Sequence, residues 1–285
     1  MSMKIGLCVY RTIVDNATIA KDAGFDYIEG TVDDILKPLE LEEEFLPVLE
    51  EIKQSPLPCL ALNGFIPAHL KVTGPDANLA ALEAYCMTAF ERAQRAGIPI
   101  IVFGSGGARK VPEGWGHERA LAQIVEFLRL VAPEARRRGV TVAIEPLFSR
   151  ATNIINTMAE GAAVAREVDE PAIRLLVDSS HWAAEPEPSV TDILAAADLL
   201  VHAHISTYKN RLFPGMEPED FTPFLSALRD ANYAGGLSIE ADGERSPETL
   251  RTACTIFTPF PAPTYLNRCG RDSEINYIYN HTAFV

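Results

Sequence analysis

The stretch VTVAIEPL at residues 140–147 decides the expected fold, because it is one of eight short apolar runs separated by helical segments. It is rich in β-branched residues and almost continuously apolar, as expected of a strand buried on both faces. The other runs share this character. We expect strands at 4–10, 27–32, 59–65, 98–105, 140–147, 173–181, 199–206 and 237–242.

The segments between these runs favour parallel pairing. The clearest helices are expected at 78–97 and 117–139, where apolar residues recur at helical spacing and arginine in the last turn precedes glycine. Strands that alternate with helices pair in parallel through right-handed crossovers. Eight such units predict an α/β fold with a single (β/α)8 TIM barrel. An open doubly wound sheet is the alternative, but the usual GxGxxG turn after the first strand is missing.

The repeat closes at a predicted helix over residues 247–257. We therefore assign residues 1–257 to the TIM-barrel catalytic domain and residues 258–285 to a C-terminal extension. The extension fits no ninth strand–helix unit. Its proline-rich start favours an extended path, and it is either an ordered cover or dimer contact, or a tail unrelated to the catalytic fold.

The composition restricts the class of partner. The 285-residue chain has 47% hydrophobic residues and a formal net charge of −14, which disfavours nucleic acid and anionic membranes as partners. A small anionic substrate held by a local arginine cluster stays possible. The five cysteines form no CxxC motif, which favours reduced thiols in a cytoplasmic protein. No apolar stretch approaches the ~18 residues of a spanning helix.

Four of the predicted strands end in side chains of the type that bind metals. They are Glu145, Asp178, His204 and Glu240. Because the carboxyl ends of the strands of a parallel barrel meet at one mouth, we expect the four to converge. Three carboxylates and one imidazole are a plausible ligand set for one divalent cation. The ligand types suit Mn²⁺, Mg²⁺, Co²⁺ or Zn²⁺ and do not choose among them.

Five segments resemble the sugar isomerase/epimerase group of xylose-isomerase-like TIM barrels, which includes ketose 3-epimerases, hydroxypyruvate isomerase-like and inosose-dehydratase-like proteins. The resemblance covers about residues 3–257. The segments are FGSGGARKVPEG (103–114), IEPLFSRATNIINT (144–157), RLLVDSSHW (174–182), HAHIS (202–206) and LSIEAD (237–242).

The resemblance implies roles for the four strand-end residues. All four would be metal ligands, and Glu145 and Glu240 would also be the acid/base pair. Proton transfer by these glutamates through a metal-stabilised cis-enediolate would then epimerise or isomerise a small sugar or a sugar-like hydroxy-carbonyl compound. The resemblance also implies homodimers or homotetramers as possible assemblies.

Further residues are expected to bind substrate. His181 and Arg211 match a substrate histidine and arginine of the group, although the seven residues from His204 to Arg211 are slightly more than the usual spacing. Arg109, Arg150 and Trp182 are further candidates for the pocket, and for each arginine a surface or loop role is the alternative. Two more residues lie near these strand ends. We expect His202 to be a core histidine, and Glu29 to be a less favoured candidate at the mouth.

One position departs from the group. Family members often carry a second glutamate six residues after the first, and here that position is Ala151. The exact reaction is therefore open. The alternatives are an enolate-type lyase resembling inosose dehydratase and a non-catalytic sugar-binding barrel. An endonuclease IV-like hydrolase is disfavoured by the presence of only six histidines and by the negative charge.

Overall fold

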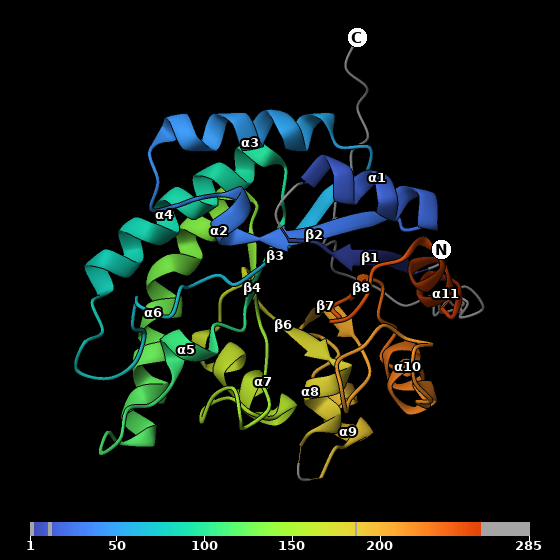
Figure 1. Cartoon of the computed structure of the whole chain (residues 1–285). Helices are drawn as coiled ribbons and strands as arrows, with labels where there is room; N and C mark the ends of the chain where they lie inside the picture. Colours follow the sequence, from blue (N-terminus) through green and yellow to red (C-terminus); the bar gives the residue numbers. More distant parts are fainter. Residues whose placement is uncertain (1–2, 11–12, 186, 258–285) are drawn as a thin grey trace, which may run out of the picture.

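A computed structural model of the chain describes residues 3–10, 13–185 and 187–257. Within them the strands form a closed barrel in which each strand pairs in parallel with its sequence neighbour, and β8 pairs with β1. Figure 1 shows the helices arranged around these strands. The predicted single (β/α)8 barrel is confirmed. The predicted C-terminal extension at 258–285 lies outside the described residues.

Every predicted strand is present, but most end earlier than expected. The bounds are β1 Lys4–Cys8, β2 Tyr27–Thr31, β3 Cys59–Asn63, β4 Ile100–Phe103, β5 Thr141–Ile144, β6 Ile173–Asp178, β7 Leu200–Ile205 and β8 Gly236–Ile239. The largest differences at the strand ends are three residues, at β5, β6 and β8; β6 was predicted to reach residue 181 and ends at Asp178. The Asp178 side chain accepts hydrogen bonds from the backbone N–H groups of Ser180 and His181, and this cap starts a short helix in place of further strand.

The helices fill the connections between strands. Their bounds are α1 Ile13–Ala23, α2 Val32–Ile35, α3 Glu42–Gln54, α4 Leu79–Ala96, α5 Gly106–Arg109, α6 His117–Arg138, α7 Met158–Val168, α8 Ser179–Ala183, α9 Val190–Ala195, α10 Thr222–Asp230 and α11 Pro247–Thr255. The two predicted stop glycines, Gly97 and Gly139, cap α4 and α6 with φ of 71°, a left-handed conformation that glycine adopts at little cost.

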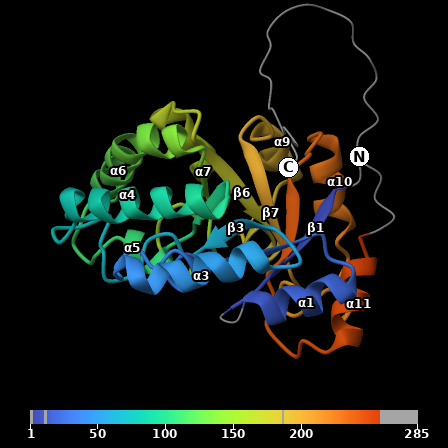
Figure 2. The same ribbon diagram turned by 90° about the horizontal axis from the view of Figure 1, so that it is seen from above.

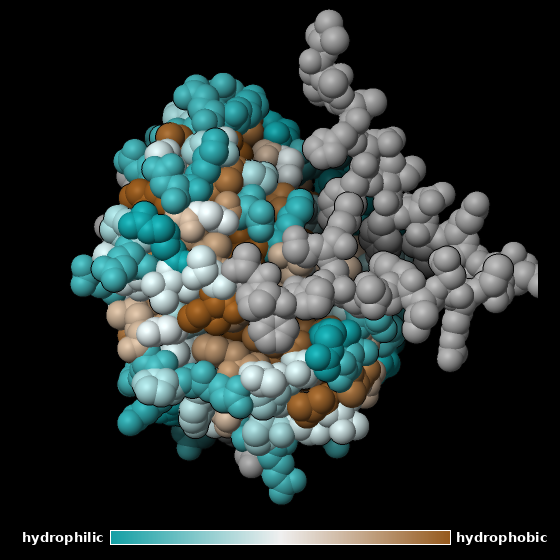
Figure 3. Space-filling model, turned by 90° about the vertical axis from the view of Figure 1, so that its right-hand side faces the viewer, coloured by the Kyte–Doolittle hydropathy of each residue, from teal (hydrophilic) through white to brown (hydrophobic). Residues whose placement is uncertain are grey.

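Most of the apolar core lies between the barrel and its surrounding helices. In the view of Figure 2, α3, α4 and α6 lie on one side of the strands and α1, α10 and α11 on the other. The outer face in Figure 3 is mostly hydrophilic, with apolar residues between the polar ones near its centre. Among the described residues, no helix combines the length and apolar character that crossing a bilayer requires.

The barrel interior is divided into an apolar and a polar part. Val102, Ala143 and Leu176 form a small apolar cluster of their own. Elsewhere Tyr27 crosses the interior to reach strand β8, where its hydroxyl lies 2.9 Å from Ser238 Oγ. Glycine makes this crossing possible, since a Cβ on Gly6 would lie 2.2 Å from the Tyr27 ring.

Candidate metal centre

The four predicted strand-end residues converge at the carboxyl mouth of the barrel. Glu145, Asp178, His204 and Glu240 each offer one ligand-type atom, and these atoms lie within 4.8 Å of one another. Asp178 and His204 are neighbours across the β6–β7 pairing. Glu145 and Glu240 each follow directly after their strands, β5 and β8. The convergence expected from parallel strand ends is therefore present.

His204 is the centre of this cluster. Its Nδ1 lies 3.4 Å from Glu145 Oε1, 3.3 Å from Glu240 Oε2 and 4.0 Å from Asp178 Oδ2. Its other nitrogen, Nε2, points away from the cluster to Glu29 Oε1 at 3.0 Å. The Nδ1 atom of the imidazole is thus directed at three carboxylates, and Nε2 is directed at a fourth, that of Glu29.

The cluster leaves buried polar atoms without hydrogen bonds. Glu145 Oε1, Asp178 Oδ2 and His204 Nδ1 are all inaccessible to solvent and have no hydrogen-bond partner. Buried polar atoms are rarely left unsatisfied in this way, and a site that binds an ion is one of the recognised explanations. Because the three atoms face a common point and are oxygen and nitrogen donors, the residues present fit a divalent cation.

The electrostatics of the cluster favour positive charge at that point. Burial alone would lower the pKa of His204, but Glu29 and Glu240 outweigh it and hold this pKa well above its usual value. Burial would raise the pKa of Asp178, yet His181, Arg211 and His204 keep it well below its ordinary range. The Asp178 carboxylate is therefore available in the ionised form that binds a cation.

Two donors hold the carboxylate of Glu240. Asn63 Nδ2 donates to Oε1 at 3.0 Å, and Arg211 Nη2 donates to Oε2 at 2.6 Å. Arg211 also donates through Nη1 to Ser180 Oγ at 2.6 Å, and Ser180 in turn donates to Asp178 Oδ1 at 2.8 Å. Predicted as a substrate residue, Arg211 thus lies at the cluster and orients two of its carboxylates.

A cavity of about 210 Å³ opens beside Arg211. Phe148, Arg150, Ser180 and Lys209 also line it. Arg150 is exposed, and its guanidinium lies over the Phe148 ring at 5.2 Å. The structure therefore places two of the predicted substrate arginines, Arg150 and Arg211, along one cavity next to the four-residue cluster.

His181 also lies at the edge of the cluster. Its Nε2 is 3.9 Å from Glu145 Oε1 and 3.5 Å from Arg211 Nη1, and its ring stacks at a tilt on Phe148 with centroids 4.7 Å apart. Its Nδ1 is buried without a partner. His181 therefore contacts two of the residues that line the cavity, Phe148 and Arg211.

The prediction that Arg109 lines the pocket is wrong. Arg109 is completely buried and donates to the backbone carbonyls of Phe103, Glu145 and Ile155 at 2.8, 2.7 and 3.3 Å. Burial lowers the pKa of Arg109 to about 10, so the side chain stays charged at neutral pH. It holds together the backbone after β4 and β5 and makes no contact with the cavity.

The prediction that Trp182 binds substrate is also not supported by its contacts. Its indole N–H donates to the Ser189 carbonyl at 3.3 Å, and its ring lies 6.0 Å from that of Phe224 in α10. Trp182 therefore packs α8 against the helical layer.

His202 is fully buried, and its Nε2 lies 2.7 Å from Glu29 Oε2. This position agrees with the predicted core histidine.

Replacing Arg109 by methionine is expected to lower the free energy of unfolding by about 3 kcal/mol, because three buried carbonyls lose a charged donor. Denaturant unfolding monitored by circular dichroism measures this. The matched control is Arg150→Met, which removes an exposed guanidinium and is expected to change stability by about 0.5 kcal/mol or less. Equal effects of the two changes would refute the structural role of Arg109.

Gly104, which follows β4, leaves room for a carboxylate of the cluster. A Cβ at this position would lie 2.3 Å from Glu145 Oε2, which is closer than atoms can approach. The close approach of the Glu145 side chain thus explains a glycine at this position.

Gly104→Ala is expected to displace the Glu145 carboxylate, which is the mobile end of its side chain, and to weaken divalent-cation binding by about tenfold or more with little loss of thermal stability. Isothermal titration with Mn²⁺ measures the affinity. Gly116→Ala serves as the control, since its Cβ would meet nothing closer than 3.9 Å. Unchanged affinity in Gly104→Ala would contradict this account of the glycine.

Two residues at the cluster were not among the site residues expected from sequence. Asn63 is the last residue of β3, and Ser180 follows Asp178. The position of Asn63 at the carboxyl end of a barrel strand was an available indication, since functional groups gather there. Ser180 carried no such indication, because its role depends on the helical cap that redirects the chain after β6.

Comparison with known proteins agrees with this architecture. Residues 17–258 match the family described as Xylose isomerase-like TIM barrel, and the chain belongs to that family. The resemblance noted in the sequence is thereby confirmed.

Two curated relatives illustrate the similarity. L-ribulose 3-epimerase of Methylomonas sp. (strain DH-1) is 30% identical over 135 residues, which is 47% of each chain. D-psicose 3-epimerase of Agrobacterium fabrum is 31% identical over 119 residues, covering 42% of this chain and 41% of the relative. In these alignments the chain spans about half the length of the curated relatives it matches.

Solved structures match over more of the chain. A crystal structure of D-psicose 3-epimerase in the presence of D-fructose superposes with a TM-score of 0.77 at 21% identity, covering 89% of this chain and 98% of the other. The apo form of 3-keto-D-glucoside 4-epimerase from E. coli gives 0.76 at 23% identity, covering 90% and 99%. At these identities the structural likeness establishes the fold.

Proposed function

We propose that this protein is a divalent-metal-dependent epimerase or isomerase of a small ketose or a similar hydroxy-carbonyl compound. The observation that carries the proposal is the set of buried, unpartnered atoms on Glu145, Asp178 and His204, which face one point at the barrel mouth together with Glu240. The family membership of residues 17–258 supports it. So do relatives named as ketose 3-epimerases.

The four side chains would hold the cation. When bound, a divalent cation polarises the carbonyl and neighbouring hydroxyl of a sugar and so makes the adjacent C–H more acidic. Asp178 would act only as a ligand, because its Oδ1 already accepts hydrogen bonds from Ser180 and His181 and only Oδ2 faces the cluster. His204 would act only as a ligand through Nδ1.

Glu145 and Glu240 would move the proton. They follow strands β5 and β8, which lie three positions apart around the barrel, so their carboxylates approach the cluster from different sides. One carboxylate removes the proton beside the carbonyl, and the other returns a proton to the opposite face of the resulting planar carbon. This arrangement inverts one carbon, which is an epimerisation; return to the neighbouring carbon is an isomerisation.

The other residues at the mouth would position the substrate. Arg211, which lines the cavity, and His181, 3.5 Å from it, would donate N–H groups to sugar oxygens. Asn63 and Arg211 together hold both oxygens of Glu240, which keeps that carboxylate in one orientation. Partly buried pairing of this kind would prepare the geometry before the substrate binds.

The proposal is tested by incubating the metal-loaded protein with a panel of ketoses that includes D-psicose, L-ribulose and D-fructose, and separating the products by chromatography. We expect conversion of at least one ketose to its epimer, with loss after chelation and recovery on adding Mn²⁺ or Co²⁺. Conversion that chelation leaves unchanged would refute the metal mechanism. Sugar binding without conversion would instead identify a non-catalytic sugar-binding barrel.

A dehydratase is the second candidate function, and the residue at position 151 favours it. Ala151 stands where the related epimerases often carry a second glutamate, and a 3-dehydroshikimate dehydratase of Pseudomonas putida is 30% identical over 145 residues. Expulsion of a hydroxyl begins with the same proton removal beside a carbonyl. Loss of water from a keto-sugar or keto-cyclitol in the same assay, in place of epimer formation, would favour this candidate.

A further inference from the structure

We propose that Glu29 is a positioning residue that fixes the orientation and the tautomer of His204, so that Nδ1 of this histidine faces the cation. This inference rests on the proposed metal site and adds to it a residue that lies outside the four-residue cluster. From the sequence, Glu29 was expected only as a less favoured candidate at the mouth of the barrel.

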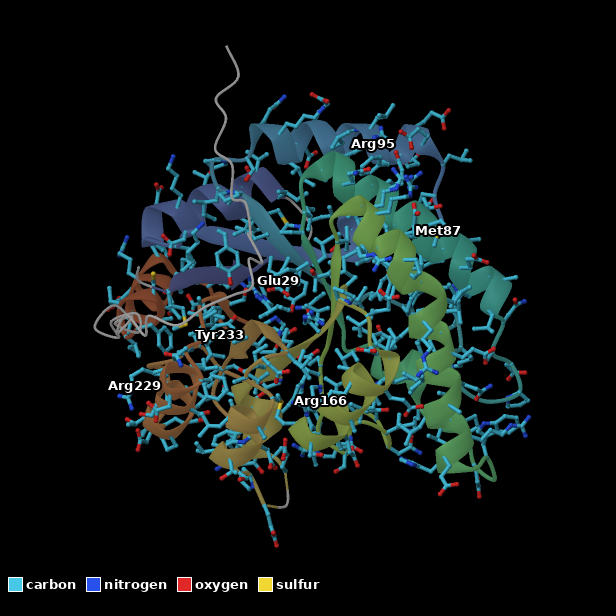
Figure 4. All side chains as sticks on the ribbon, turned by 180° about the vertical axis from the view of Figure 1, so that it is seen from behind. Glu29, Met87, Arg95, Arg166, Arg229 and Tyr233 are labelled. Atoms are coloured by element: carbon cyan, nitrogen blue, oxygen red, sulfur yellow. The ribbon has the colours of Figure 1, made fainter. Side chains whose placement is uncertain are left out.

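The carboxylate of Glu29 bridges two imidazoles. Its Oε1 lies 3.0 Å from His204 Nε2, and its Oε2 lies 2.7 Å from His202 Nε2. All three side chains are completely buried. Figure 4 shows Glu29 among the strands at the middle of the molecule, whereas Arg95 and Arg229 lie at its periphery. Within the barrel, each oxygen of Glu29 is therefore used by one histidine.

The bridge determines where the histidine protons lie. An ionised carboxylate only accepts hydrogen bonds, so both Nε2 atoms must be the donors. If a cation takes the place of a proton on Nδ1, His204 keeps its other proton on Nε2 and presents the lone pair of Nδ1, the atom directed at Glu145, Asp178 and Glu240. A carboxylate behind a metal-binding histidine also raises the basicity of the imidazole.

A column of polar groups holds Glu29 from behind. His202 Nε2 also lies 3.3 Å from Ser238 Oγ, which is 2.9 Å from the Tyr27 hydroxyl. Two glycines make space for this column, because a Cβ on Gly6 or Gly236 would lie 2.2 or 2.5 Å from Tyr27. The polar contacts thus continue from the mouth into the barrel interior without interruption.

A direct ligand role for Glu29 fits the geometry less well. Cys8, Glu29 and His204 also place ligand-type atoms within 4.8 Å of one another. However, both oxygens of Glu29 are already engaged by imidazoles. The contacts therefore favour a positioning role.

The first test is the affinity of the purified full-length protein for Zn²⁺ and Mn²⁺, measured by competition with a fluorescent chelator. The glutamine amide in Glu29→Gln accepts from one imidazole but presents an N–H to the other, so it cannot satisfy both. We expect it to weaken binding about 10- to 100-fold. Tyr27→Phe, two residues earlier in β2, removes a buried polar group of the same column without touching His204, and its affinity should stay within about threefold of wild type.

Equal losses in Glu29→Gln and Tyr27→Phe would overturn the inference, because they would indicate a general effect of disturbing the interior. A wild-type affinity in Glu29→Gln would overturn it as well. If wild type binds metal, Asp178→Asn does not, and either of these two results is obtained, the proposed metal site stands and only the role of Glu29 is refuted. If wild type binds neither ion, the proposed metal site fails and the inference fails with it.

A second measurement does not depend on the variants folding. Long-range ¹H–¹⁵N correlation spectra of the Zn²⁺-loaded wild type report which nitrogen of each histidine carries a proton. We expect His204 to be protonated at Nε2 and bound at Nδ1. Protonation at Nδ1 with the metal at Nε2 would overturn the inference, whatever the activity of the protein.

Discussion

Glu240→Gln is expected to reduce the turnover of a converted ketose by about 10³-fold or more while the barrel stays folded. The amide cannot take up a proton as a carboxylate does, and general acid–base groups commonly contribute 10²–10⁴-fold. The change also places an amide between Asn63 and Arg211, both of which are donors to Glu240. Steady-state kinetics at saturating Mn²⁺, together with thermal unfolding, measure the two properties.

Saturating metal separates the two roles of Glu240. If this residue were only a ligand, excess Mn²⁺ would restore turnover in the variant, so rescue near the wild-type rate would contradict its acid/base role. Glu244→Gln is the matched control. This glutamate is exposed and follows Glu240 by four residues, and its replacement is expected to leave both rate and metal affinity unchanged.

Asp178→Asn is expected to weaken divalent-cation binding by about 100-fold or more and to remove activity with it. The asparagine keeps an oxygen at Oδ1, where the side chain caps α8 through Ser180 and His181. It puts an N–H₂ group in place of Oδ2, the buried atom that faces the cluster without a hydrogen-bond partner. A donor at that position opposes a cation directly.

Isothermal titration with Mn²⁺ and Co²⁺ measures the loss, and thermal unfolding without added metal shows whether the cap has survived. Asp198→Asn provides the control, because Asp198 pairs with Arg166 at the surface and has no contact with the cluster. A variant at position 178 that bound metal as tightly as wild type would show that the cation, if any, lies elsewhere.

The fold was predictable from sequence because the strands are short and apolar on both faces and the helices carry clear stop signals. Strand ends were predicted less well. The run through RLLVDSSHW looks continuous, yet Asp178 caps a helix there, a local hydrogen bond that apolar patterning does not record. Such caps decide whether His181 belongs to a strand or, as in the structure, to a helix beside the cluster.

The convergence of the four strand-end residues was predictable for a general reason. Parallel strands bring their carboxyl ends to one rim, so position in sequence fixes position in space. The roles of Arg109 and Glu29 depend instead on tertiary contacts, which the sequence pattern does not show. An arginine in a loop after β4 can line a pocket or bind carbonyls, and only the fold places the carbonyls of Phe103, Glu145 and Ile155 around it.

The contribution of Glu29 depended on two strands that are distant in sequence. Glu29 on β2 meets His202 and His204 on β7 across the interior of the barrel. The spacing of two residues puts both histidines on one face of the strand, but it does not indicate the acidic partner that lies between them. The interior of a barrel is where sequence patterns are least informative, because contacts there join strands that are not paired.

The proposed epimerisation requires Glu145 and Glu240 to exchange a proton with a ketose at the carbon beside its carbonyl. Conversion of a ketose by the Mn²⁺-loaded protein in D₂O, followed by mass spectrometry and NMR of the first-turnover product, measures this exchange. Because the returning proton comes from a carboxylate in exchange with solvent, we predict one deuterium at the inverted carbon. An epimer that carries no deuterium, or the absence of any product across the ketose panel, would contradict the account.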